Sequence, residues 1–258
     1  MLSLRFYSHH GYIIVAALSM LFACSPDDGD DGDDGDPRGV ATIDSAFGGL
    51  TLVNVIEPPA GRQAFFGDLL LEALDEEVAL QPGFVSASVH RSLDNDYLVN
   101  YAKWESPDAV EAFGAEVEAG AAPKLAEVFA ETTSEFHPYA IAQQVHKEEG
   151  PVRIDDRYWT MINVLVPDDT TMQSSLSELL GRAMREEAAA QPGFVSASVH
   201  VSLDNEYVLN YAQWSDASAL EAFGAKVAAG EAPLLGAAFA RARAEFHPYG
   251  DIHTIEAR

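Results

Sequence analysis

The sequence QPGFVSASVH occupies residues 81–90 and returns, letter for letter, at residues 191–200. The offset of 110 residues continues downstream, and 38 of 59 positions are identical between residues 81–139 and residues 191–249. Self-similarity at a fixed offset indicates two copies of one structural unit. Each copy has a length that is usual for one small domain. The chain is therefore predicted to contain the same fold twice.

The order of local signals within each copy predicts strand, helix, strand, strand, helix, strand. In the first copy the period-2 and helical patterns, together with Pro and Gly breakers, place these elements at residues 50–56, 65–80, 84–90, 97–104, 108–115 with a second short helical piece at 124–130, and 135–145. Asp94-Asn95 is the predicted turn between the middle strands, and Pro138 marks the last strand as an edge or bulged strand. This order is the split βαβ, ferredoxin-like α+β arrangement, with helices on one face of a four-stranded antiparallel sheet. The predicted domains are residues 48–146 and 157–258, and the charged segment 147–156 is the predicted linker.

The N-terminus has the pattern of a secretory signal. An apolar run from Tyr12 to Ala23 follows Arg5 and ends at Cys24, the single cysteine of the chain. A run of this length is too short to span a bilayer but suits the apolar region of a signal peptide. The sequence LFAC resembles the lipobox of bacterial lipoproteins, which implies a signal peptide at residues 1–23 and lipidation of Cys24. Ser25, rather than Asp, follows the cysteine and favours delivery to the outer membrane of the cell envelope.

Residues 27–36 read DDGDDGDDGD and contain seven Asp and three Gly. Such a tract cannot bury apolar surface, so residues 24–47 are predicted to form a solvated, disordered tether. Weak calcium binding is the alternative, although the spacing and the closing Glu of an EF-hand loop are missing. The chain as a whole carries a formal net charge of −26. This charge argues against nucleic acid and anionic membrane surfaces as partners.

Alternation along the strands predicts a second sheet face that combines aromatic and polar side chains. The strand at 84–90 presents Phe84, Ser86, Ser88 and His90 on one side and Val85, Ala87 and Val89 on the other. With an even hairpin register, His90 would share the face turned away from the helices with Asn100 and Trp104. The second copy has the same set: Phe194, Ser196, Ser198, His200, Asn210 and Trp214.

A face of this composition is typical of a largely apolar pocket with a few placed polar groups. A second identical sheet packed over it would form a barrel within one chain, which would explain the duplication and favours a monomer. The structural alternative is that His and Asn only complete hydrogen bonds and that Trp only fills space. No His, Cys and carboxylate cluster with metal-ligand spacing is present, so no metal is predicted.

The segment PGFVSASVHRSLDNDYLVNYAKWESPDAVEAF resembles the antibiotic biosynthesis monooxygenase domain, which has a dimeric α+β barrel fold. The resemblance implies oxidation of an aromatic or quinone-like compound by dioxygen without a cofactor. It also implies pocket roles for His90, Asn100 and Trp104 and for His200, Asn210 and Trp214. In these roles Asn polarises a substrate oxygen, Trp stacks on the ring and His moves a proton.

Two family positions differ in this chain. Val110 and Leu220 stand where quinol-oxidising members have a Tyr, and Lys124 and Leu234 stand where they have an Arg.

A sister group with this fold degrades haem. Asn54 and Asn163 stand where its Asn belongs, and they are predicted to contribute to substrate binding. Phe113 or Phe223 and Pro123 or Pro233 replace its Trp and His, which disfavours haem degradation. Two other readings stay open besides the oxygenase: a binding module that has lost the chemistry, and a structural surface lipoprotein.

The lipobox resemblance yields a test. Replacing Cys24 with Ala removes the thiol that would be lipidated, so the protein should move from the detergent phase to the aqueous phase, or should keep its signal peptide. Phase partitioning of the two proteins with a nonionic detergent measures this change. Equal partitioning of both proteins would contradict the anchor.

Overall fold

The computed structural model of the chain describes residues 41–148 and 150–258. The predicted signal segment, Cys24 and the acidic tract at 27–36 lie outside these residues. Each copy has the predicted element order. The first copy consists of β2 (Leu50–Glu57), α1 (Gln63–Ala73), η2 (Leu74–Val78), β3 (Phe84–Ser92), β4 (Leu98–Trp104), α2 (Pro107–Glu118), α3 (Pro123–Glu131) and β5 (Thr133–His146).

The second copy repeats this order with small differences in length. It consists of β7 (Trp159–Pro167), η3 (Thr170–Met172), α4 (Gln173–Ala183), η4 (Met184–Ala188), β8 (Phe194–Ser202), β9 (Val208–Trp214), α5 (Ala217–Ala228), α6 (Pro233–Phe239) and β10 (Ala242–Glu256). The predicted turn at Asp94-Asn95 is present, and Asn95 and its counterpart Asn205 adopt φ values of 66° and 68°. Asparagine tolerates this left-handed conformation better than most residues. No helix among the described residues is long and apolar enough to cross a membrane.

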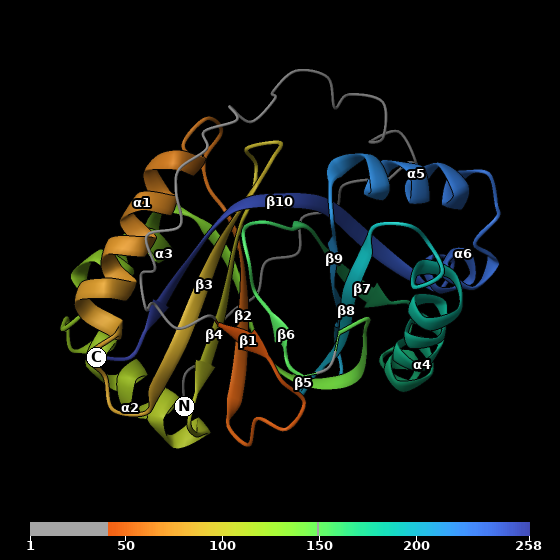
Figure 1. Cartoon of the computed structure of the whole chain (residues 1–258). Helices are drawn as coiled ribbons and strands as arrows, with labels where there is room; N and C mark the ends of the chain where they lie inside the picture. The colour runs from red at the N-terminus through yellow and green to blue at the C-terminus, as the bar shows by residue number, and fades with distance from the viewer. Residues whose placement is uncertain (1–40, 149) are drawn as a thin grey trace.

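The two sheets join into one closed barrel with the strand order β10-β3-β4-β2-β5-β8-β9-β7. Closure depends on the two last strands, which are long enough to serve both copies. β5 pairs with β2 over Thr133–Tyr139 and with β8 over Tyr139–His146. β10 pairs in the same way with β7 and then with β3. Figure 1 shows β5 and β10 passing from one sheet to the other, with the helices outside. The predicted intramolecular α+β barrel is confirmed.

Pro138 was expected to mark an edge or a bulged strand, and it lies where β5 passes from one copy to the other. It pairs with Leu52 of β2, and its carbonyl accepts a hydrogen bond from the Leu203 amide at 2.9 Å. The bulge itself comes later, between Ile141 and Gln143. Proline is tolerated here because its missing amide donor is not needed by either ladder.

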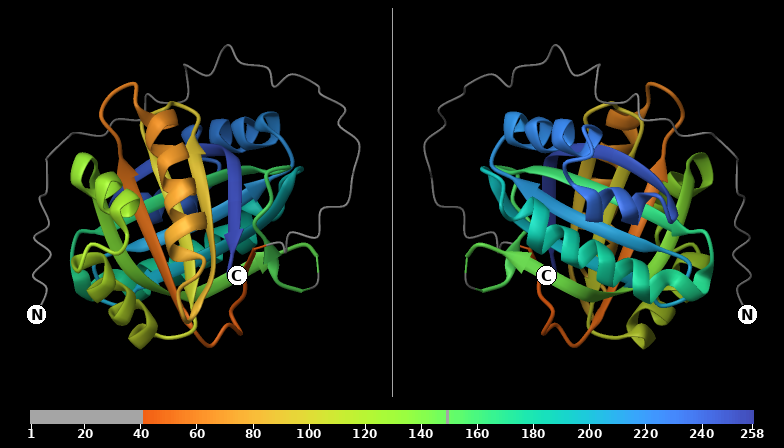
Figure 2. Two further views of the ribbon diagram at one scale, coloured as in Figure 1. Left: turned by 90° about the vertical axis from the view of Figure 1, so that its left-hand side faces the viewer. Right: turned by 90° about the vertical axis from the view of Figure 1, so that its right-hand side faces the viewer.

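The central strands of the barrel are buried on both faces, because the helices cover the outside and the opposite sheet covers the inside, whereas β5 and β10 retain exposed residues. Every residue of β4 and of β9 is buried. The outer face of each sheet packs with its own helices, α1 over the first sheet and α4 over the second (Figure 2). The inner faces of both sheets share a third apolar cluster in the barrel lumen, which includes Val53, Val99, Ile162 and Leu209.

A two-stranded sheet absent from the sequence prediction packs on this lumen cluster. β1 (Thr42–Ile43) pairs with β6 (Val152–Arg153). These strands lie in the predicted tether and linker, so the folded part of the chain begins before residue 48. The side chains of Ile43 and Val152 are buried in the lumen cluster. Lys103 Nζ donates to the carbonyl of Thr42 at 3.2 Å.

The lumen also contains two histidines and four tyrosines that link the copies. The Tyr211 hydroxyl lies 3.0 Å from His90 Nε2, and the Tyr101 hydroxyl lies 3.1 Å from His200 Nε2. His90 Nδ1 faces the carbonyl of Ser88 at 3.1 Å. A carbonyl only accepts, so Nδ1 carries the proton and Nε2 accepts from Tyr211. Each neutral imidazole thus takes one hydrogen bond from the other copy. Tyr139 and Tyr249 complete the set.

The lumen histidines predict a pH dependence of stability. Burial lowers the pKa of His90 and of His200 from 6.5 to about 4, and backbone carbonyls offset this effect in part. Between these values the unfolded chain binds protons that the folded chain does not bind. Stability is therefore fully present above pH 6.5 and falls as the pH falls toward 4, by about 1.4 kcal/mol per pH unit for each histidine.

The measurement is urea unfolding at several pH values. A variant with His90→Gln and His200→Gln retains an acceptor for each tyrosine but cannot titrate, so its stability should depend less on pH between 6.5 and 4. The carboxylates titrate in both proteins and cancel in the comparison. Parallel curves for the two proteins would show that the lumen histidines do not carry this effect.

Candidate functional site

The hairpin register separates the residues that were predicted to share one face. His90 pairs with Val99 and Val89 pairs with Asn100. His90 therefore points into the lumen, whereas Asn100 and Trp104 point to the helices. The second copy has the same register, with His200 opposite Leu209 and Val199 opposite Asn210. The predicted grouping of His, Asn and Trp on one face is wrong, because the register differs by one residue from the one assumed.

The other predicted site residues divide in the same way. Ser86, Ser88, Ser196 and Ser198 belong to the buried, lumen-facing series that contains the histidines. A register shift between Phe84 and Ser86 moves Phe84 to the helix-facing side, and Phe194 shifts likewise. The helix-facing site therefore contains Asn54, Phe84, Asn100 and Trp104 in the first copy and Asn163, Phe194, Asn210 and Trp214 in the second.

Two asparagines lie side by side at the centre of each helix-facing site. Asn54 of β2 is the direct partner of Asn100 on β4, and Asn163 of β7 is the partner of Asn210 on β9. All four side chains are at most 4 % exposed. Their surroundings are apolar, so each site places two carboxamides in the layer between the sheet and the helices.

Four side-chain oxygen or nitrogen atoms of these asparagines are fully shielded from solvent and have no hydrogen-bond partner. In the first copy Asn54 Oδ1 and Asn100 Oδ1 are both unpaired. In the second copy Asn210 Nδ2 donates to Asn163 Oδ1 at 3.1 Å, but Asn163 Nδ2 and Asn210 Oδ1 are unpaired. A buried polar group without a partner costs about 1–3 kcal/mol. Asn100 Oδ1 and its counterpart Asn210 Oδ1 are both without a partner. An unpaired polar atom at the same place in both copies is the arrangement expected of a group that binds a ligand.

Aromatic rings border the asparagine pair of each copy. In the first copy, Trp104 meets Phe84 edge to face with ring centroids 5.3 Å apart and stacks on Phe113 at 5.4 Å. Phe136 of β5 is the neighbour of Asn54 on the other side and contacts Phe129 of α3 at 4.7 Å. The second copy has the same contacts through Phe194, Trp214, Phe223, Phe239 and Phe246.

The sequence reasoning missed this second group of rings. Phe136 and Phe246 belong to the repeated EFHPY segment, so their repetition was a usable signal. Phe113 and Phe223 were considered only as replacements for a haem-group tryptophan. Neither asparagine nor tryptophan titrates in the physiological range, so the site can bind, orient and hydrogen-bond a flat molecule but supplies no strong base. No cluster of metal-ligating side chains is found within the described ranges 41–148 and 150–258.

The helices over each site are fixed to very different degrees. α1 buries five residues, whereas α2 buries none and α5 buries only Phe223. A helix with few buried contacts opens locally at low cost. Movement of α2 or α5 is therefore the least costly way to expose Trp104 or Trp214 to a ligand.

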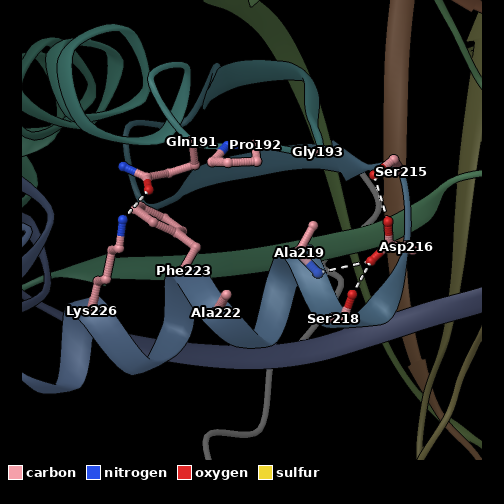
Figure 3. Close-up of a pocket in the computed structure, with 10 residues that line it drawn as sticks. All are labelled: Gln191, Pro192, Gly193, Ser215, Asp216, Ser218, Ala219, Ala222, Phe223 and Lys226. Carbon is pink, nitrogen blue, oxygen red and sulfur yellow. Dashed lines mark hydrogen bonds between the residues drawn. The ribbon is translucent and has the colours of Figure 1, made fainter.

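A surface groove of about 380 Å³ runs along α5 in the second copy. Its lining includes Gln191, Pro192, Ala219, Ala222, Phe223 and Lys226. Figure 3 shows the Phe223 ring between α5 and the Gln191-Pro192 turn, with Lys226 at one end and Asp216 at the other. The Phe223 ring stacks on Trp214 with centroids 5.2 Å apart. One aromatic ring therefore separates the groove from the buried site.

The unpaired polar atoms of the asparagines predict that these residues lower the stability of the protein while they serve its function. Asn100→Leu retains the branched side-chain skeleton and removes the unpaired Oδ1, so the free energy of unfolding should rise by about 1–3 kcal/mol. Asn210→Leu should raise it less, because this change also removes the hydrogen bond to Asn163 Oδ1. Urea unfolding at pH 7 measures the change.

The control for this prediction is a buried amide that is fully used. Gln63 Nε2 donates to the carbonyls of Ser92 and Tyr97 at 2.8 Å each, and Gln173 does the same to Ser202 and Tyr207. Gln63→Leu with Gln173→Leu should lower stability. A loss of stability in the Asn100→Leu variant as well would contradict the assignment of Asn100 as a group without a structural role.

Comparison with known proteins agrees with this fold. The family described as antibiotic biosynthesis monooxygenase matches residues 49–125 and 171–243, which is more than half of the chain and includes both copies. Tetracenomycin-F1 monooxygenase of Streptomyces glaucescens is 39 % identical over 67 residues, which span 26 % of this chain and 60 % of that protein.

A solved structure described as an anthrone oxidase-like protein superimposes with a TM-score of 0.70. It covers 84 % of this chain and 97 % of its own, at 22 % sequence identity, and so supports the fold. The whole of that protein thus corresponds to both copies together. By the match of both repeats to the family, this chain belongs to the antibiotic biosynthesis monooxygenase family.

Proposed function

We propose that the protein is a cofactor-independent monooxygenase that oxidises an aromatic or quinone-like compound with dioxygen. The observation that carries the proposal is the pair of buried, partly unpaired asparagines among aromatic rings in each copy. Family membership supports the same reaction class. The reaction needs a substrate that is acidic enough to form a carbanion, such as an anthrone. One oxygen atom enters the product and the other leaves as water.

The aromatic residues of the site bind the substrate, and the asparagines stabilise the enolate that forms from it. The rings of Trp104, Phe84 and Phe136 offer flat apolar surfaces on which an aromatic substrate can stack. The Nδ2 groups of Asn54 and Asn100 in the first copy, and that of Asn163 in the second, can donate hydrogen bonds to the substrate oxygen, on which negative charge collects when the C–H proton leaves. Such hydrogen bonds are stronger to an enolate than to the neutral ketone, so they favour ionisation. The unpaired Oδ1 atoms only accept and suit a hydroxyl group of the substrate. Burial excludes water from the carbanion until oxygen reacts.

The position of His90 changes the proton pathway that the family resemblance suggested. His90 is fully buried in the lumen, on the opposite face of the sheet from Asn100 and Trp104. It holds Tyr211 rather than a ligand. The family Tyr and Arg are also replaced here, by Val110 and Lys124 in the first copy. Ionisation therefore relies on the acidity of the substrate and on the asparagines. Water accepts the C–H proton while the site is open to solvent, and the enolate is enclosed before oxygen reacts.

Oxygen consumption with 1,8-dihydroxyanthrone tests the reaction. In the variant Asn100→Ala with Asn210→Ala, turnover should fall about 100-fold or more, because one oxyanion donor is worth about that factor. Binding of the anthrone should weaken much less. The variant His90→Gln with His200→Gln should retain turnover within about threefold, a change that corresponds to less than 1 kcal/mol.

Three results would contradict parts of this proposal. Tight binding of the anthrone without oxygen uptake would favour a binding module that has lost the chemistry. Equal turnover in the asparagine variant would remove Asn100 and Asn210 from the reaction. Loss of turnover in a folded histidine variant would bring the lumen back into the mechanism.

We also propose that the protein acts as a lipid-anchored monomer in the cell envelope. The LFAC sequence and the acidic tract motivate the anchor and the tether, as given above. Closure of the barrel within one chain supports the monomer, because every barrel strand among the described residues is already paired on both sides. Light scattering of the mature protein checks the second point, and a stable dimer at micromolar concentration would contradict it.

A further inference from the structure

One end of the groove on α5 carries Lys226, and Lys147, which is not part of the groove lining, bonds to the same Gln191. Lys226 Nζ donates to Gln191 Oε1 at 2.6 Å, and Lys147 Nζ donates to the Gln191 carbonyl at 3.3 Å. The chain has 15 basic residues against 41 acidic ones. Two ammonium groups that bond to one glutamine therefore form a local positive site in a negatively charged chain. Both lysines reach Gln191 from segments far apart in the sequence.

The remainder of the groove is suited to a flat apolar group. Phe223 lies between α5 and the Gln191-Pro192 turn, next to Ala219 and Ala222 (Figure 3). The negative charge of the groove is Asp216, at the end opposite Lys226. Its carboxylate is occupied by the start of α5, where it accepts from the Ala219 amide at 2.9 Å. The groove thus combines an aromatic floor with one cationic end.

The first copy has the opposite charge at the equivalent positions. Glu116 stands where the second copy has Lys226. Ala257 takes the place of Lys147, because the Ala257 amide bonds to the Val85 carbonyl as the Lys147 amide bonds to the Val195 carbonyl. Neither replacement is conservative.

The other end of the equivalent surface is more acidic as well. Glu105 replaces Ser215 and Asp108 replaces Ser218, whereas Ser106 replaces Asp216, so this end has two carboxylates in the first copy and one in the second. The Glu105 side chain also leans over Gly83, so that Oε2 lies 3.8 Å from the position of a Cβ added to that glycine. The first copy therefore presents carboxylates where the second presents lysines and serines.

We infer that the two copies accept different ligands, and that the groove of the second copy is an uptake site for aromatic anions. The flat ring system lies on Phe223 and Pro192, and its carboxylate, sulfonate or phenolate meets Lys226 and Lys147. The first copy, which repels anions, takes neutral aromatic compounds. The inference rests on the proposed function, because a ligand bound in the groove would pass from there to the Trp214 site. Binding in the groove itself requires no turnover.

Two fluorescent probes of the same shape separate charge from shape. 1-Anilinonaphthalene-8-sulfonate is an anion, and N-phenyl-1-naphthylamine is the same molecule without the sulfonate. In the full chain, Lys147→Ala with Lys226→Glu installs the residues of the first copy. Affinity for the sulfonate should fall about tenfold or more, as expected from a loss of roughly 1.4 kcal/mol of Coulomb attraction. Affinity for the neutral probe should change less than about twofold, or 0.4 kcal/mol.

Matched variants locate the binding. Ala222→Trp fills the groove and should abolish the high-affinity binding of the sulfonate, whereas Ala112→Trp at the equivalent position of the first copy should leave it unchanged. Added salt should weaken sulfonate binding to the wild-type protein more than to the lysine variant. Circular dichroism and Tm confirm that each variant is folded.

Unchanged sulfonate affinity in the lysine variant would overturn the inference, as would an equal loss for both probes or equal effects of Ala222→Trp and Ala112→Trp. These outcomes are independent of the reaction. Sulfonate binding that follows the lysines in a protein without oxygen uptake supports the groove and contradicts only the proposed oxygenase. Oxygen uptake without lysine-dependent binding of the sulfonate supports the proposed oxygenase and contradicts the proposed groove site.

Discussion

Sharing of the last strand of each copy is the constraint on which this structure depends. β5 gives its first half to β2 and its second half to β8, and β10 does the same for β7 and β3. A single copy would leave half of this strand without a ladder and one sheet face without cover. Because both sheets close together, the central strands β4 and β9 are buried on both faces, and polar groups inside the barrel need partners within the protein, some of them from the other copy. The pairs His90–Tyr211 and Tyr101–His200 meet that requirement.

The sequence predicted the fold well because the signals that specify it are local and repeated. Strand alternation, the helical stripe and the Asp94-Asn95 turn each depend on a few neighbouring residues. The faces of the strands were harder to predict, because a change of one residue in the hairpin register exchanges them. His90 pairs with Val99 rather than with Asn100, and the shift between Phe84 and Ser86 turns Phe84 to the helices. Neither feature has a local signature, since both follow from packing of the whole barrel.

The site could be predicted in its composition but not in its location. Asn54 and Asn100 are direct partners, and Trp104 lies on the same face four residues further along β4, but this face lies between the sheet and the helices rather than between the two sheets. All residues of β4 are buried, so the alternation of apolar core residues with polar surface residues, which normally shows which face of a strand is inside, is missing. The sheet of β1 and β6 was missed for a different reason. Two-residue strands carry too little pattern to be seen, and the burial of Ile43 and Val152 depends on the lumen that they cover.

Fusion of the two copies has a consequence for how the sites can change. In a dimer of identical chains, one codon change alters both sites at once, and a substitution that benefits one pocket must be tolerated by the other. Here Lys226 and Glu116 are encoded separately although they occupy the same place in the fold. The duplicated half can therefore diverge while its twin preserves the older property. Covalent linkage also keeps the halves at a fixed one-to-one ratio, so that an asymmetric barrel is made every time the chain folds.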